Sequence, residues 1–156
     1  MSADNNDLNL VQNGYYLQFG EANATDAIRL FKLENGISTL LCSGMDGQIA
    51  NSFTVGIKVV LTSSNVWELY ADLSGGMNYG LQGSFTDLNV LTGTTFGYLC
   101  TYTASNATKF YLDDVYIGSP VLDVQPPQLL QATAISSGQI DALFNEALST
   151  SSATEL

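Results

Sequence analysis

The sequence contains no histidine, and this absence removes several kinds of functional site at once. Histidine is the commonest general base, the commonest ligand of transition metals and the usual charge switch near neutral pH. A Ser-His-Asp or Cys-His catalytic site is therefore excluded, as is any zinc site that uses histidine. The most frequent hydrolytic mechanisms are not available to this chain.

Positive charge is also scarce, since four Lys and Arg residues stand against 15 Asp and Glu residues and the formal net charge is −11. Nucleic-acid binding needs a basic surface that neutralises phosphates, and an anionic membrane surface is disfavoured by the same charge. No apolar run approaches the roughly 18–20 residues of a membrane helix. We therefore expect no nucleic acid as a partner and no membrane insertion.

Cysteine is limited to Cys42 and Cys100, which lie in the apolar stretches LLCSG and YLCTY. Two residues so far apart in the chain cannot make a four-cysteine zinc site or a CxxC redox pair. Both stretches are typical of strands, so a disulfide between strands in an oxidising compartment is one prediction. Two small buried thiols are the alternative, because free cysteine is among the most buried residue types.

Short runs of alternating apolar residues fill the chain up to residue 118. Hydrophobic residues make up 46% of the 156 residues, enough for a packed core, and charged residues only 12%. Turn residues divide the runs at a spacing of roughly 10–12 residues, which predicts an all-β antiparallel sandwich. The expected strands are 15–19, 27–33, 37–42, 53–61, 66–72, 79–85, 96–102 and 109–117.

The turn at Asn35-Gly36 is the strongest local signal in this series. Asn-Gly favours a two-residue type I′ turn, in which both central residues have positive φ. The sequence therefore predicts a hairpin between the second and third expected strands.

The character of the chain changes at Ser119, because residues 120–127 contain all three prolines. Proline cannot donate to a strand ladder and stiffens connectors, so we expect a domain at 1–118, a linker at 119–127 and a second segment at 128–156. That segment is too short to bury a core of its own. Residues 129–135 suit a strand, whereas 139–148 suit either a helix or, with Ile140 and Phe144 on one face, a strand.

Over about residues 5–118 the chain contains, in this order, the motifs NGYYLQFGE, AIRLFKLENG, LLCSGMDGQIANSFTV, WELYADLSGG and FGYLCTYTASNATKFYLDDVYIG. This ordered succession resembles a family of large surface proteins of Bacteroidetes. In that family a jelly-roll module of the concanavalin A-like or laminin-G-like kind precedes immunoglobulin-like repeats and often a lamin-tail domain. The tail DVQPPQLLQATAISSGQIDALFNEALS is similar to the opening two strands of such a repeat.

The resemblance implies a location and a domain context. It implies a secreted protein at a bacterial cell surface, of which this chain is an internal piece with neighbouring domains. Residues 1–118 would lack N-terminal strands of the sandwich, and 128–156 would be a truncated Ig-like domain. The strand interpretation of residues 139–148 is the one that the resemblance favours.

Asp113 and Asp114 lie in FYLDDVYIG. Jelly rolls of the resembled kind place an Asp near this point to hold a structural calcium, which needs six to eight oxygen ligands. The alternative is one carboxylate in solvent and one that caps a turn, and it is the stronger because the other ligands cannot be named. No other cofactor is expected.

Aromatic residues are the main indication of a ligand. In the expected strand 66–72, Trp67 alternates with core-like residues, whereas Tyr70 shares its face with Glu68. Exposed rings beside polar groups are typical of sugar-binding sandwiches, although aromatics also fill β cores. We interpret Tyr70, Glu68 and Tyr79 as candidate ligand-binding residues for a polysaccharide or glycoprotein.

The sequence therefore predicts a noncatalytic extracellular module for binding or spacing, with glycans as a candidate ligand. A fragment of a glycan-active enzyme is one alternative, but glycoside hydrolysis needs two carboxylates about 5–10 Å apart. Glu68 and Asp72 lie roughly 13 Å apart along a strand. A structural unit that assembles through open sheet edges is the other alternative.

Overall fold

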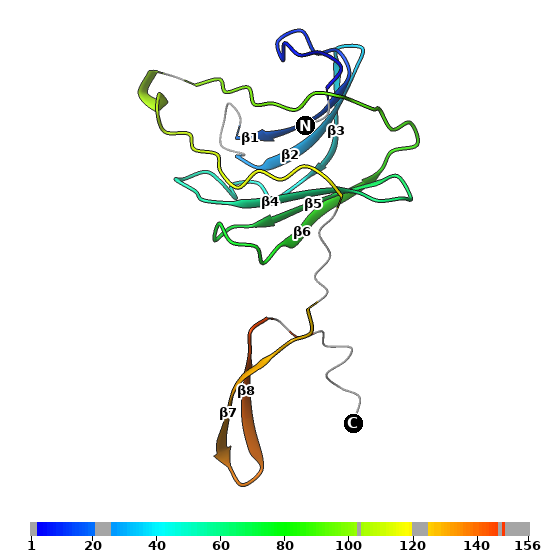
Figure 1. The fold of residues 1–156 in the computed structure, drawn as a ribbon. Helices are drawn as coiled ribbons and strands as arrows, with labels where there is room; N and C mark the ends of the chain where they lie inside the picture. Colours follow the sequence, from blue (N-terminus) through cyan, green and yellow to red (C-terminus); the bar gives the residue numbers. More distant parts are fainter. Residues whose placement is uncertain (1–2, 21–25, 103, 120–124, 147, 149–156) are drawn as a thin grey trace. The chain divides into compact units, whose positions relative to one another are not determined.

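The structure, a computed structural model, describes residues 3–20, 26–102, 104–119, 125–146 and 148. Within these residues the elements are strands, apart from one turn of 3-10 helix, η1, at Ala104–Asn106. The strands form three small antiparallel sheets (Figure 1), which confirms the all-β prediction. They are β1 (Gly14–Phe19), β2 (Ile28–Glu34), β3 (Ile37–Ser43), β4 (Gly56–Leu61), β5 (Val66–Asp72), β6 (Gly80–Thr86), β7 (Leu129–Ser136) and β8 (Gln139–Phe144).

The first sheet has the order β1-β2-β3. The tight connection between β2 and β3 is the predicted Asn-Gly turn, with φ of 52° at Asn35 and 76° at Gly36. Glu34 pairs with Ile37 across this turn. Positive φ at both central residues is the signature of a type I′ turn, so the predicted hairpin is confirmed.

The second sheet has the order β4-β5-β6. Its central strand, β5, has the bounds expected from the sequence, whereas β4 starts at Gly56 and not at residue 53. In β5 the residues Leu69 and Ala71 are buried, and Trp67 packs against the same core. The alternation within this strand was therefore predicted correctly.

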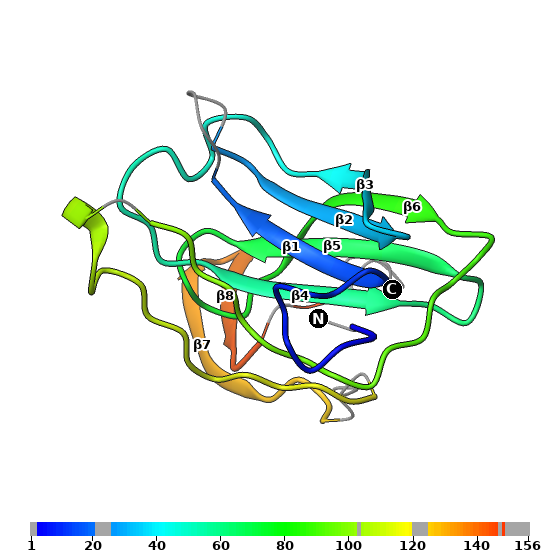
Figure 2. The same ribbon diagram turned by 90° about the horizontal axis from the view of Figure 1, so that it is seen from above.

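The two three-stranded sheets lie one over the other and share a core (Figures 1 and 2). Ile28 of β2 and Leu69 of β5 are fully buried within it. The sheets approach closely at β3 and β6, because a Cβ built on Gly83 would lie 3.0 Å from the Cβ of Cys42. The buried members of the core are Tyr15, Ile28, Leu30, Leu41, Cys42, Ile49, Leu69 and Ala71.

Residues 96–102 and 109–117 are not strands in the structure, and this part of the prediction was wrong. Their alternation suits a sheet, but a strand also needs a neighbour that accepts and donates its backbone hydrogen bonds. Among the described residues the only ladder contact here is an isolated bridge at Thr95. The side chains remain open to solvent, with Leu99 64% and Tyr111 87% exposed.

The chain divides into two compact units, Met1–Asp114 and Val115–Leu156, which we call unit 1 and unit 2. The division falls shortly before the expected linker 119–127, of which residues 120–124 lie outside the described part. In unit 2, β7 and β8 pair as a hairpin, with Ala132 opposite Ala142. Residues 139–144 are thus a strand, as the resemblance suggested, and the helix alternative was wrong.

Candidate ligand-binding face

The outer face of the second sheet collects the three residues that the sequence singled out. Glu68 and Tyr70 point away from the core because they alternate with the buried Leu69 and Ala71. Tyr79 directly precedes β6. The structure brings Tyr70 and Tyr79 next to Lys58 of β4, which lies opposite Tyr70 in the strand register, and Glu68 contacts Tyr70. We call these four residues the Tyr70–Tyr79 face.

Direct contacts hold this group together. The Tyr70 hydroxyl donates a hydrogen bond to Glu68 Oε2 at 2.9 Å, and this bond is the main reason that the pKa of Tyr70 is raised. Lys58 Nζ lies 4.5 Å from the ring centroid of Tyr70 and 5.0 Å from that of Tyr79. Such cation–π contacts are each worth about 0.5–1 kcal/mol at exposed sites. One exposed ammonium therefore links two half-buried rings.

Asp72 organises the loop that carries Tyr79. Its carboxylate accepts hydrogen bonds from the backbone N–H of Ser74 at 2.9 Å, from the Ser74 hydroxyl at 2.6 Å and from the N–H of Asn78 at 2.9 Å. The hydroxyl bond from Ser74, followed by the backbone bonds, lowers the pKa of Asp72. The residue is buried, so its role is to fix the turn.

Gly56 is a positioning residue that the sequence reasoning missed. A Cβ at this position would collide with the backbone oxygen of Gly76 and would lie 3.4 Å from Cε1 of Tyr79. The loop after β5 therefore rests on the backbone at the start of β4. A glycine inside a strand-like run often marks such a close approach, and this signal could have identified Gly56.

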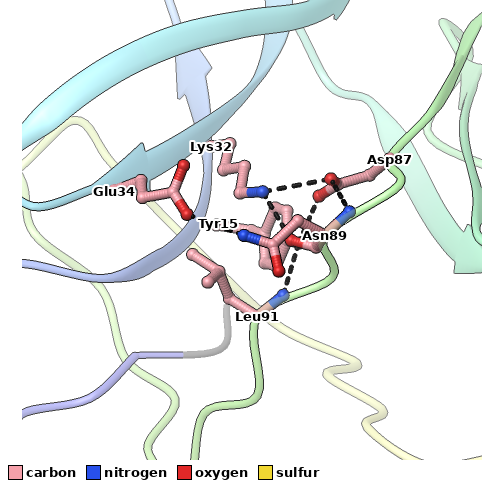
Figure 3. Close-up of polar contacts among 6 residues, drawn as sticks. All are labelled: Tyr15, Lys32, Glu34, Asp87, Asn89 and Leu91. Atoms are coloured by element: carbon pink, nitrogen blue, oxygen red, sulfur yellow. Dashed lines mark hydrogen bonds and ion pairs between the residues drawn. The ribbon is translucent and has the colours of Figure 1, made fainter.

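A second group of polar residues is buried inside unit 1 (Figure 3). Lys32 Nζ forms an ion pair with Asp87 Oδ1 at 3.0 Å and donates to the carbonyl oxygen of Asn89 at 2.6 Å. The Tyr15 hydroxyl donates to Asp87 Oδ2 at 2.6 Å and accepts the N–H of Leu91 at 2.9 Å. These contacts tie β1 and β2 to the segment that follows β6.

The pKa values in this network reflect its geometry. Burial, with the hydrogen bond to Asp87 as the next cause, raises the pKa of Tyr15 to about 12. Burial alone would raise the pKa of Asp87, but hydrogen bonds from Tyr15, Asn89 and Lys32 outweigh it and the net pKa is lowered. Both carboxylate oxygens and the ammonium have partners inside the protein. The network therefore serves the fold and leaves no reactive group open to a ligand.

The remaining candidates from the sequence are not brought together with this face. Cys42 is buried and Cys100 is exposed, and both are free thiols, so the predicted disulfide is not formed in this structure. Asp114 has a positive φ of 49°, as in a turn. Within the described part of the chain no group of three or more acidic, cysteine or histidine side chains gathers. Calcium binding by Asp113 and Asp114 stays a prediction. These two carboxylates are the only ligands that can be named for it, whereas calcium takes six to eight oxygen ligands.

Comparison with known proteins identifies no relative. No family model matches the chain, and no curated protein or solved structure is significantly similar to it. Among the described residues, no helix has the length and apolar character needed to cross a membrane.

Proposed function

We propose that this chain is a noncatalytic binding module of a secreted bacterial surface protein, and that its Tyr70–Tyr79 face binds a glycan. The observation that carries the proposal is the pair of rings held around Lys58 beside the Tyr70–Glu68 hydrogen bond. Both rings are half-buried, and the exposed part of each can stack against the C–H surface of a sugar. Glu68 and Lys58 supply an acceptor and a donor for its hydroxyl groups.

The charge of the chain favours a neutral glycan within this proposal. A net charge of −11 repels polyanions at long range. Lys58 places one positive charge against the Tyr70 ring, and Glu68 places one negative charge at the Tyr70 hydroxyl. Uncharged polysaccharides, or the uncharged glycans of a glycoprotein, are therefore the ligand class that we propose.

The fold that goes with this function is a jelly-roll sandwich of the laminin-G-like kind in unit 1, with the start of an Ig-like domain in unit 2. Two stacked antiparallel sheets with one core support the first part. The hairpin β7–β8 supports the second. Both assignments are proposals that extend the observed all-β architecture.

A binding role suits this face better than glycoside hydrolysis. Glu68 is engaged by the Tyr70 hydroxyl, and Asp72 is engaged by its own loop. Hydrolysis needs one carboxyl group of raised pKa as the acid, opposite a second carboxylate. The pKa of Asp72 is instead lowered, so this residue cannot be that acid near neutral pH.

The proposal is tested by screening the full chain against an array of neutral polysaccharides and then measuring affinity for the best ligand. Tyr70→Ala and Tyr79→Ala should each weaken binding about two- to tenfold, because a lost ring contact is worth about 0.5–1.5 kcal/mol. Tyr111→Ala is the matched control, since Tyr111 is a fully open ring elsewhere in unit 1. If no polysaccharide binds, or if the control loses as much affinity, the face is not a glycan site and a spacer role replaces it.

A further inference from the structure

The strand β6 carries a β-bulge directly beside the Tyr70–Tyr79 face. In its ladder with β5, Gly83 pairs with Leu69. Two residues earlier Leu81 pairs with Tyr70, which leaves Gln82 as an extra residue in the ladder. In a regular strand, Leu81 and Gly83 would lie on the same face of the sheet. A bulge changes the face to which the side chains beyond it point.

The bulge places a leucine on the solvent side of the second sheet. Gly83 faces the core, because a Cβ built on it would lie 3.0 Å from the Cβ of Cys42. Leu81 faces outward with Tyr70, since residues paired across strands share a face, and it is 57% exposed. Without the bulge, Gln82 would stand opposite Tyr70. The bulge therefore gives the Tyr70 ring an apolar neighbour in place of a polar one.

Hydrogen bonds hold the bulge in this form. Gln82 Oε1 accepts from Gln48 Nε2 at 2.7 Å, and Gln82 Nε2 donates to the carbonyl oxygen of Gly80 at 3.0 Å. The side-chain amide of Gln82 is therefore engaged within the protein. Bulges are frequent at sheet edges and next to active sites, where they redirect a side chain, and β6 is the last strand in the order β4-β5-β6. The outward position of Leu81 is thus a built feature of β6.

Leu81 completes a row that crosses the second sheet. Lys58 of β4 pairs with Tyr70 of β5, and Tyr70 pairs with Leu81 of β6. The row is about 10 Å long, close to the length of a linear disaccharide, because neighbouring strands lie roughly 4.8 Å apart. The Tyr79 ring adjoins the Lys58 end of the row, with its centroid 5.0 Å from Lys58 Nζ. We call the side chains of Tyr79, Tyr70 and Leu81 the cross-strand track.

Polar groups lie beside the track. The next outward residue of β5 is Glu68, which pairs with the exposed Ser84 of β6. These two side chains supply a carboxylate acceptor and a hydroxyl group. The apolar surface therefore runs across the strands and has hydrogen-bonding groups along its side. A linear sugar chain has the same character, since C–H groups cover the flat sides of its rings and hydroxyl groups line their edges.

We propose that a linear neutral polysaccharide binds across the strands, with one sugar residue at the Tyr70–Tyr79 face and the next on Leu81. This inference rests on the proposed function of that face and adds a second subsite, a chain direction and a ligand class. A neutral chain suits the track because none of its three side chains is charged. Leu81 is then a specificity residue, since a single sugar at the first subsite does not need it.

Calorimetry with the full chain tests the second subsite. The probes are linear glucan, mannan and xylan oligosaccharides from mono- to tetrasaccharide, and the trisaccharide that binds best is measured with every variant. Leu81→Ala should weaken its binding about three- to tenfold, because apolar contact area is lost. Leu81→Tyr should strengthen it, because the variant adds a ring to the track. Leu88→Ala is the matched control and should change nothing, since Leu88 is 92% exposed beyond the end of β6.

The opposite effects expected of Leu81→Ala and Leu81→Tyr separate a binding role from a loss of fold, which would weaken binding in both. If Tyr70→Ala weakens trisaccharide binding while both Leu81 variants bind as the native chain does, the second subsite is overturned and the glycan site stands. If no linear probe binds, the inference is overturned. The proposed function falls with it only if the polysaccharide array also yields no ligand whose binding depends on Tyr70.

Discussion

Lys32 and Asp87 carry opposite charges into the interior of unit 1, where a charge without a partner is very costly. Their side chains are 9% and 6% exposed and lie 3.0 Å apart. Tyr15 and Asn89 complete the bonding of the carboxylate. The pair is tolerated because almost every lone pair and proton in it is satisfied within the protein.

Asp87→Asn should therefore lower the free energy of unfolding by about 3–5 kcal/mol, the usual effect of leaving one buried charge unpaired. Urea denaturation at pH 7 measures it. Asp46→Asn is the control, since Asp46 is 70% exposed where it meets Arg29 at 3.4 Å, and it should cost less than about 1 kcal/mol. Because the folded pKa of Asp87 lies below its ordinary value of 3.8, the stabilisation is complete above that pH and fades as the pH falls through the folded pKa. Equal losses of unfolding free energy in Asp87→Asn and Asp46→Asn would contradict a stabilising role for the buried Lys32–Asp87 ion pair.

Tyr15→Phe should change the alkaline limit of stability. The folded pKa of Tyr15 is about 12, above its ordinary value of 10.0, so the folded state holds this proton more tightly than the unfolded state. Its contribution is then complete below pH 10 and is lost as the pH rises toward 12. Thermal unfolding from pH 9 to 12 should show a smaller loss of Tm in Tyr15→Phe than in the native chain. Parallel losses would show that another group controls the alkaline transition.

The positions of some of these side chains could be predicted from the sequence, and those of others could not. The outward direction of Glu68 and Tyr70 followed from their alternation with Leu69 and Ala71, because side-chain direction in a strand has a period of two. Burial of Lys32 was not predicted. Its parity with Ile28 and Leu30 placed it on the inner face, but only a partner distant in sequence, Asp87, makes a buried lysine acceptable.

At the scale of elements, the position of Tyr79 depends on the loop between β5 and β6 and on the strand beneath it. The bonds of Asp72 fix the loop from within. Gly56 of β4 lets the backbone of Gly76 approach from above. The Tyr70–Tyr79 face is thus assembled from two adjacent strands and one turn.

Gly56→Ala should displace this loop, because the new methyl group meets the backbone oxygen of Gly76. We expect a loss of stability of about 1–3 kcal/mol and weaker binding of the glycan through Tyr79. Gly80→Ala is the matched control on β6, where the nearest atom to a new Cβ is 3.8 Å away. Melting curves and glycan affinities of both variants test this prediction. Equal Tm values and equal affinities for Gly56→Ala and Gly80→Ala would contradict the packing of the loop on β4.

The elements themselves were predictable where their partners are near in sequence. The Asn35-Gly36 turn pairs β2 with β3 directly, and β5 pairs with the neighbouring β4 and β6. Residues 96–102 and 109–117 have the same alternation, yet they form no ladder. Alternation of apolar and polar residues shows that a segment is suited to a sheet. It does not show whether another strand lies beside that segment to pair with it.

At the scale of the whole molecule, the two units differ in how much they bury. Unit 1 has a core drawn from two sheets. In the β7–β8 hairpin of unit 2, every residue is exposed except Phe144, which is half-buried. Leu129, Ala132, Ala134, Ile140, Ala142 and Phe144 form one apolar face of the hairpin, as the strand register shows. A two-stranded hairpin with an uncovered apolar face is marginally stable in water.

Amide exchange should therefore differ between the units by about a hundredfold or more, since local opening of the hairpin costs far less than opening of the core. The slow reference amides are those of Ile28 and Leu69, the two largest fully buried side chains among the described residues. Exchange monitored by NMR gives both rates in one experiment. Equal protection of β7–β8 and of the core would contradict the independent, marginal stability of the hairpin.

Binding of a glycan to the outer face of the second sheet is tested by an NMR titration with an oligosaccharide from the best array ligand. The amide signals of Lys58, Glu68, Tyr70 and Tyr79 should shift together and saturate with one affinity. The signals of Lys32 and Asp87, inside the molecule, should move little. Saturable shifts that cluster away from the Tyr70–Tyr79 face, or no shifts at all, would contradict the account.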